Sequence, residues 1–161
     1  MGNHELSYLS YKNNKHDLSD QKKAGTYKKL KKSDFKYIKS LPFFIKINNL
    51  AIVHAGITNK TKLKSAKKKE LEKLPYIVYL NEKNKTKLWN KHYNGNQGIV
   101  VYGHKPSKSV KIDKFSIGID TGCAYGGKLT AIIISDTKKP MKNYKIMSVK
   151  AKNKYARHRL F

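Results

Sequence analysis

Two apolar segments of this sequence each run into a histidine that lies beside a glycine. LAIVHAG places His54 after residues 50–53, and GIVVYGHKP places His104 after residues 99–102. Short apolar runs bounded by turn residues are typical of buried strands, and a neighbouring glycine lets the backbone aim a side chain at a ligand. In α/β folds, polar groups gather beyond the C-terminal ends of the strands. We therefore expect an α/β domain whose site lies where these strands end.

The rest of the chain alternates between helical and strand patterns. Apolar spacing predicts helices at residues 5–15 and 33–41, and Pro42 ends the second helix, which we expect Ser33 to cap. Asn48 and Asn49 lie between two apolar runs and predict a tight hairpin turn. Further expectations, in chain order, are a helical patch at 66–74, a loop at 81–87, a strand ending at Asp120, a Gly-rich turn at 121–127, and strands at 129–135 and 143–151.

The chain opens on MGNHE, a third cluster of polar residues beside a glycine. A single histidine at a strand end is usually a hydrogen-bonded surface or core residue, and we interpret His16, His92 and His158 in that way. Three Gly-neighboured sites in one chain favour a metal site, because histidine is the commonest metal ligand among side chains. The carboxamide oxygen of Asn3 is a hard ligand that suits Mn²⁺ or a mixed site better than a thiolate-rich zinc site.

The net charge of +26 favours a polyanionic partner. The kind of basic residue that supplies this charge weakens that interpretation. All but two of the 36 basic residues are lysine, whereas arginine is the residue favoured for bidentate phosphate and guanine contacts. A bias toward lysine and asparagine of the kind that AT-rich genomes produce explains the composition better. Weak, nonspecific binding to polyanions is expected under either explanation.

The motifs GNHE, VHAG and YGHKP, in this order, resemble the later motifs of the calcineurin-like metallophosphoesterases. The similarity is to the phosphoprotein-phosphatase branch, and within it to the bacterial diadenosine-tetraphosphate hydrolases and the phosphatase module of bacterial polynucleotide kinase-phosphatases. IDTGCAYGGKLTAI is close to another block of that group. The resemblance implies two sheets packed face to face with helices outside. Residues 1–149 would be the C-terminal part of this β-sandwich, flanked by helices, and residues 150–161 a basic tail.

The resemblance also assigns roles to residues of the three motifs. Asn3, His54 and His104 would bind the second of two metal ions, with Mn²⁺ favoured and Fe, Zn or Ni as alternatives. His4 would protonate the leaving oxygen as a general acid, and Glu5 would orient His4.

The Gly-rich block supplies three further candidates. Asp120, Tyr125 and Lys128 could approach the substrate, although turn formation and packing explain these residues better. Cys123 matches a position in the family, and we interpret it as structural. As the only cysteine of the chain, it has no partner for an internal disulfide, which fits a reducing compartment.

Two earlier motifs of the family do not occur in this sequence. Asp-x-His would supply the first metal, and Gly-Asp-x-x-Asp-Arg-Gly would supply the bridging carboxylate and a phosphate-binding arginine. We therefore expect the chain to be an N-terminally truncated phosphoesterase with little activity by itself. Lys105 stands where the group has threonine, and Pro106 follows it as in the phosphoprotein-phosphatase branch.

Three hypotheses about function follow. The first is a metal-dependent phosphoesterase acting on a phosphoprotein, a dinucleoside polyphosphate or the terminal phosphate of a nucleic acid. The second is a non-catalytic remnant that binds polyanions through its lysines, and the third is half of a split enzyme completed by a separate N-terminal chain. Because no apolar run reaches the roughly 18 residues of a membrane helix, we expect a cytoplasmic protein without a membrane partner.

Overall fold

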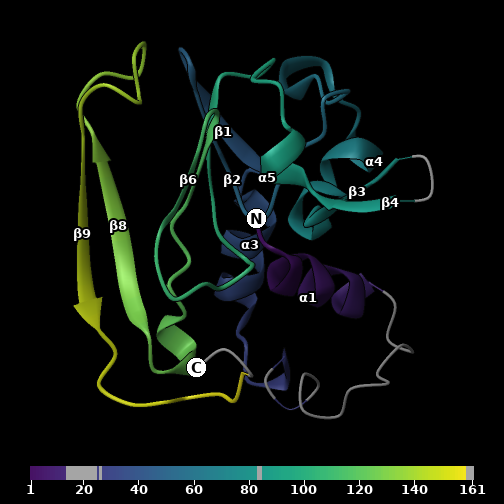
Figure 1. The fold of residues 1–161 in the computed structure, drawn as a ribbon. Helices are drawn as coiled ribbons and strands as arrows, with labels where there is room; N and C mark the ends of the chain where they lie inside the picture. Colours follow the sequence, from purple (N-terminus) through teal and green to yellow (C-terminus); the bar gives the residue numbers. More distant parts are fainter. Residues whose placement is uncertain (14–24, 26, 83–84, 159–161) are drawn as a thin grey trace.

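The computed structural model describes residues 1–13, 25, 27–82 and 85–158. Its centre is a five-stranded mixed sheet in the order β1-β2-β5-β7-β6 (Figure 1). β2, β5 and β7 run parallel to one another, while β1 and β6 pair antiparallel at the two edges. The bounds of these strands are β1 Phe44–Ile47, β2 Leu50–Val53, β5 Ile99–Tyr102, β6 Lys111–Asp113 and β7 Ser116–Gly118.

Alternation along the central strands divides the core into two clusters. Val100 and Tyr102 of β5 belong to one cluster, and Ile99 and Val101 belong to the other, because successive side chains of a strand point to opposite faces of the sheet. Short elements between β2 and β5 cover the first face. They are η1 Leu63–Ser65, α4 Lys68–Leu71, η2 Leu74–Tyr76, β3 Tyr79–Glu82, β4 Lys85–Leu88 and α5 Trp89–His92.

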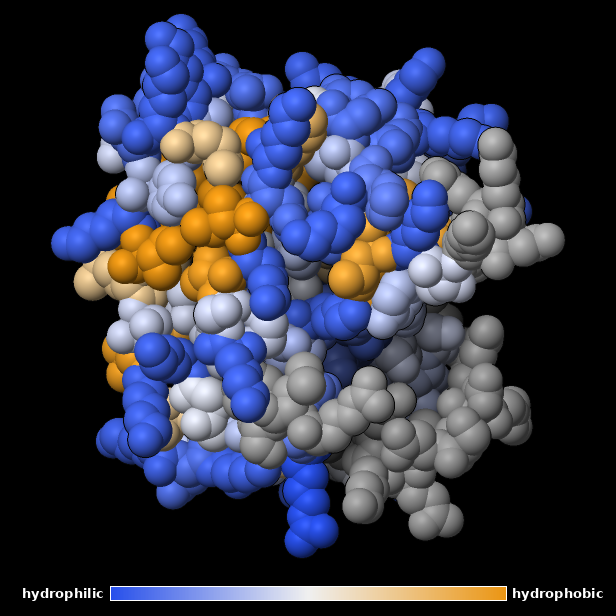
Figure 2. Space-filling view, viewed as in Figure 1, coloured by the Kyte–Doolittle hydropathy of each residue, from blue (hydrophilic) through white to orange (hydrophobic). Residues whose placement is uncertain are grey.

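A two-stranded ribbon covers the second face of the sheet. β8 (Lys128–Ile134) and β9 (Tyr144–Lys150) pair antiparallel, and Ile132 and Ile134 pack against the cluster that contains Ile117. The predicted face-to-face packing of two sheets is therefore confirmed, as is the α/β class. The outward face of the ribbon is exposed and apolar: Leu129 is 66% and Val149 is 72% exposed. Figure 2 shows two groups of apolar side chains, a larger one on the left of the view and a smaller one near its centre, on a face that is otherwise largely hydrophilic.

Two helices lie beside the sheet and meet through aromatic side chains. α1 spans Asn3–Asn13 and α3 spans Lys32–Ser40, and the ring of Tyr8 packs edge-on against that of Phe35, with centroids 6.1 Å apart. Both helices were predicted, but the predicted cap at Ser33 is wrong. The carboxylate of Asp34 accepts a hydrogen bond from the Lys31 N–H at 2.8 Å, so the helix begins one residue earlier than Ser33.

Most predicted strands are confirmed, one expected loop is corrected, and one strand was not predicted. The hairpin at Asn48 and Asn49 is present, and Asn48 takes a positive φ of 48°. The predicted loop at 81–87 is wrong where the structure describes it. β3 and β4 pair antiparallel there, in a register that runs from Tyr79 opposite Leu88 to Glu82 opposite Lys85. Strand β6 was not predicted. The Gly-rich turn contains η3 (Cys123–Tyr125), which Gly122 and Gly126 flank in the left-handed conformation.

The C-terminal segment returns to the Gly-rich turn. The Ala151 N–H donates to the Gly127 carbonyl, and the Tyr155 N–H donates to the Ala124 carbonyl. The proposed boundary between a domain and a tail at residue 150 stays a prediction. No helix in the described part of the chain is long and apolar enough to cross a membrane.

Candidate metal centre

Three parallel neighbouring strands place polar residues at one edge of the sheet. His54 follows β2, His104 follows β5 one glycine later, and Asp120 follows β7 one residue later. The carboxyl ends of parallel strands share an edge, which is where α/β folds build their sites. The Gly103 N–H donates to the His54 carbonyl at 2.9 Å, so the backbones of the two histidine segments are also joined there.

Helix α1 brings the third side chain to this edge. Gly2 is buried against the ring of His54: a Cβ at this position would lie 2.8 Å from His54 Nδ1 and 2.6 Å from Glu5 Oε2. Glycine thus allows the start of the helix to approach the histidine. The Gly2 N–H donates to Glu5 Oε2 at 2.9 Å, which satisfies one of the unpaired N–H groups of a helix N-terminus, and Asn3 follows at the first helical position.

The side chains of Asn3, His54 and His104 converge on one point. Asn3 Oδ1 lies 2.9 Å from His54 Nε2, and His104 Nδ1 lies 3.0 Å from the same nitrogen. We call this set the Asn-His-His triad. A carboxamide oxygen and two unprotonated imidazole nitrogens each carry a lone pair, so these three atoms can bind one cation; without a cation, a proton on His54 Nε2 can be donated to the other two atoms.

Both imidazoles are held in the neutral form that a metal requires. Burial is the main effect that lowers the pKa of His54 to about 4, and the charge on His104 acts in the same direction. Burial also lowers the pKa of His104, while the neighbouring Asp120 carboxylate opposes this shift. Protons therefore do not compete for these nitrogens at neutral pH.

The backbone at His104 is strained. Its φ is +69°, and the Lys105 N–H donates across it to the Gly103 carbonyl at 2.8 Å. A positive φ and a hydrogen bond between residues two apart describe a γ-turn of the rarer, strained kind. Such strain in a residue other than glycine is characteristic of functional sites. In this conformation His104 Nδ1 lies 3.0 Å from His54 Nε2.

The donor set fits a divalent cation of borderline hardness. One carboxamide oxygen and two imidazole nitrogens suit Mn²⁺, Fe²⁺, Ni²⁺ or Zn²⁺. No group of three His, Cys, Asp or Glu side chains that could hold a metal occurs among the described residues. The role of Asn3 as the third ligand stays a prediction. The metal identity stays a prediction.

The other predicted site residues lie around the triad or in the Gly-rich turn. His4 is exposed, and its charge lowers the pKa of His54 and of His104, so it lies close to both rings. The Glu5 carboxylate accepts from the Gly2 N–H, and its orienting effect on His4 stays a prediction. Asp120 Oδ1 accepts from the Gly122 N–H at 3.0 Å.

Tyr125 and Lys128 have structural contacts within the turn. The ring of Tyr125 packs on that of His158 at 4.8 Å, and Lys128 pairs with Lys150 at the start of the ribbon. These contacts fit the packing explanation, and a substrate role for either residue stays a prediction. His92 is exposed, while His16 lies outside the described residues.

Comparisons with known proteins show which proteins this chain is similar to. No family model matches the sequence. The chain is 32% identical over 100 residues to bis(5'-nucleosyl)-tetraphosphatase PrpE [asymmetrical] of Oceanobacillus iheyensis, covering 56% of this chain and 38% of that protein. It is 31% identical over 112 residues to the protein of the same name from Geobacillus sp., covering 63% of this chain and 44% of that protein.

A solved structure shares the fold. The crystal structure of a candidate diadenosine tetraphosphatase superposes with a TM-score of 0.73 at 23% identity, over 94% of this chain and 67% of that one. The predicted resemblance to the calcineurin-like metallophosphoesterases is confirmed. The chain spans less than half the length of the curated relatives that it matches.

Sequence reasoning missed the wall of side chains beside the triad. Tyr102 and Trp89 are buried with their rings edge-to-face, 4.9 Å between centroids, and a Cβ on Gly56 would lie 2.5 Å from Trp89 Nε1. From the sequence, the aromatic residues of LWNK and VVYGH could be predicted only to be part of the core. Their position next to the histidines depends on the sheet order, which no local pattern contains.

Proposed function

We propose that this chain carries one metal-binding half of a phosphoesterase site and that its substrates are dinucleoside polyphosphates. The observation that supports this most directly is the convergence of Asn3 and His104 on Nε2 of His54, within 3.0 Å. The names of the similar proteins add the substrate class, since both are tetraphosphatases of bis-nucleosyl compounds.

The residues at this site would have three separate roles. Asn3, His54 and His104 would hold one divalent cation, which supplies a Lewis acid for a phosphate oxygen. His4 is exposed beside the triad, so its ring can reach the leaving oxygen of a bound phosphate and donate a proton to it. The Glu5 carboxylate is bound to the Gly2 N–H and thereby fixes the start of the helix that carries His4.

Asp-x-His and Gly-Asp-x-x-Asp-Arg-Gly are not present in these 161 residues. A paired-metal site needs a bridging carboxylate that the triad does not supply. We therefore expect this polypeptide alone to bind one metal ion and to hydrolyse little substrate. Activity would appear when a polypeptide carrying both motifs is added.

The direct test is metal binding rather than turnover. Titration of Mn²⁺ into the chain, followed by calorimetry, should give one site, and His54→Ala should abolish it. His92→Ala is the matched control, because His92 is exposed and lies outside the triad. Equal binding by His54→Ala and His92→Ala would refute the assignment of the triad.

Polyanion binding is the second candidate, and the net charge of +26 favours it. This function does not need the triad. Binding of RNA that weakens steeply with salt and is unchanged in His54→Ala would support it. Loss of both RNA and Mn²⁺ binding in that variant would instead place the polyanion at the metal centre.

A further inference from the structure

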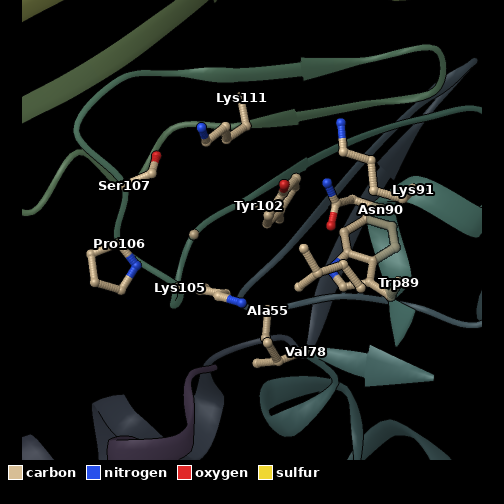
Figure 3. Close-up of a pocket in the computed structure, with 12 residues that line it drawn as sticks. Ala55, Val78, Trp89, Asn90, Lys91, Tyr102, Lys105, Pro106, Ser107 and Lys111 are labelled. Carbon is tan, nitrogen blue, oxygen red and sulfur yellow. The ribbon is translucent and has the colours of Figure 1, made fainter. Parts of the chain in front are cut away.

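We propose that a cavity beside the Asn-His-His triad binds the nucleoside group of a nucleoside phosphate. The inference rests on the proposed function and extends it from the phosphate to the group that carries it. The cavity has a volume of about 210 Å³, and Figure 3 shows the side chains around it.

The cavity adjoins the metal ligands directly. Its lining includes Ala55, which follows His54, and Gly103 and Lys105, which flank His104. The lining therefore comes from residues that are next to two members of the triad along the chain. This adjacency is the reason to place the nucleoside in the cavity and its phosphate at the triad.

The walls of the cavity suit a flat group with apolar faces. Val78, Leu88, Trp89 and Tyr102 contribute apolar surface, and the Trp89 and Tyr102 rings meet at 72°, which gives two flat surfaces at an angle. Inorganic phosphate or a metal ion gains nothing from such walls, whereas a nucleobase buries its faces there. Apolar walls with a few fixed polar groups are typical of small-molecule sites.

Two polar atoms of the lining are available for the edge of a base. The Asn90 amide donates through Nδ2 to Asp113 Oδ2 at 2.6 Å, which leaves Oδ1 as its acceptor. The ring of Tyr102 is buried, and its hydroxyl has no hydrogen-bond partner in the described part of the chain. A base that offers one donor and one acceptor could satisfy both atoms.

Lysines lie between the cavity and solvent. Lys105 Nζ is 2.8 Å from the Tyr79 hydroxyl and 4.5 Å from the centre of that ring, while Lys91 is fixed by Asp113 at 2.6 Å. Lys111 also lines the cavity. Since Lys105 follows His104, its ammonium group is placed to neutralise phosphates that extend from the nucleoside toward the triad.

The only tryptophan of the chain makes the proposal measurable. Trp89 is the single tryptophan and lines the cavity, so its fluorescence reports on a base bound there. We would titrate ATP, adenosine and inorganic tripolyphosphate into the whole chain in the presence of a chelator. ATP and adenosine should change the emission saturably, and tripolyphosphate should not. An equal change with tripolyphosphate, or no change with ATP, would overturn the proposal.

Variants separate the cavity from the lysine-rich surface. Ser107→Phe places a ring in the cavity and should weaken the binding of adenosine and ATP about tenfold. Ser109→Phe is the matched control, because Ser109 is exposed and does not line the cavity. Lys105→Gln changes an exposed side chain and should weaken ATP more than adenosine. Unchanged affinity in both Ser107→Phe and Lys105→Gln would refute the subsite.

Failure here is distinguishable from failure of the proposed function. If Mn²⁺ binds through the triad and no adenosine compound alters Trp89 emission, the metal centre stands and the nucleoside subsite is wrong. If adenosine binds with the expected variant pattern and Mn²⁺ does not bind, the subsite stands and the metal centre is wrong.

Discussion

The strained backbone at His104 predicts an unusual reversal between glycine and alanine. An L-residue in the left-handed region costs roughly 1–2 kcal/mol relative to glycine, whereas glycine at an ordinary position costs about 0.5–1 kcal/mol relative to alanine. His104 has a φ of +69°, and His54 is not among the described residues with positive φ. His54→Ala should therefore be more stable than His54→Gly, and His104→Ala should be less stable than His104→Gly.

The comparison between the two positions isolates the strain. His54 and His104 contact each other, so the Ala and the Gly variant at each position lose the same ring contact. The greater freedom of glycine in the unfolded chain is the same at both positions, so it cancels when the two Ala-to-Gly differences are subtracted. The double difference in the free energy of unfolding should be roughly 1–2 kcal/mol, or about five- to thirtyfold in the folded-to-unfolded ratio. Urea denaturation of the metal-free chain, followed by circular dichroism, measures it. A double difference of zero would refute the strain.

Three further predictions concern the helix start, two phenols and the ribbon. Gly2→Ala should abolish Mn²⁺ binding in calorimetry, because the added Cβ would lie 2.8 Å from His54 Nδ1. Burial raises the pKa of Tyr93 and of Tyr102 to about 12; the unfolded chain therefore loses these protons first, and the free energy of unfolding should fall as pH rises from 10 to 12 in urea titrations. Val149→Lys should raise solubility in sedimentation assays at unchanged thermal midpoint, because that side chain is 72% exposed.

Each of these predictions has a control or a contrary outcome. Gly25→Ala is the control for Gly2→Ala, because a Cβ on Gly25 meets nothing within 4 Å. A free energy of unfolding that rises between pH 10 and 12 would contradict the burial of Tyr93 and Tyr102. Aggregation that is equal in Val149→Lys and the parent chain would show that the ribbon face does not drive self-association.

Local patterns predicted the elements that depend on local physics. The apolar runs before His54 and His104 form strands, and Asn48 and Asn49 make the turn between β1 and β2, because burial and turn geometry are properties of a few consecutive residues. The segment 81–87 was mistaken for a loop, since its polar residues carry no apolar alternation. Its described residues, 81–82 and 85–87, belong to β3 and β4, which pair with each other. Strand formation there depends on the pairing partner rather than on the local sequence.

The sequence by itself determined which residues could be ligands and that two of them, His54 and His104, follow apolar strands. It did not determine that Asn3 Oδ1 and His104 Nδ1 would both lie within 3.0 Å of His54 Nε2, or that Trp89 and Tyr102 would wall a cavity next to them. Those facts follow from the parallel order β2-β5-β7 and from the approach of α1 over Gly2. Residues some 50 positions apart meet only when the whole sheet is assembled, because contacts between distant segments are set by packing and not by the local backbone.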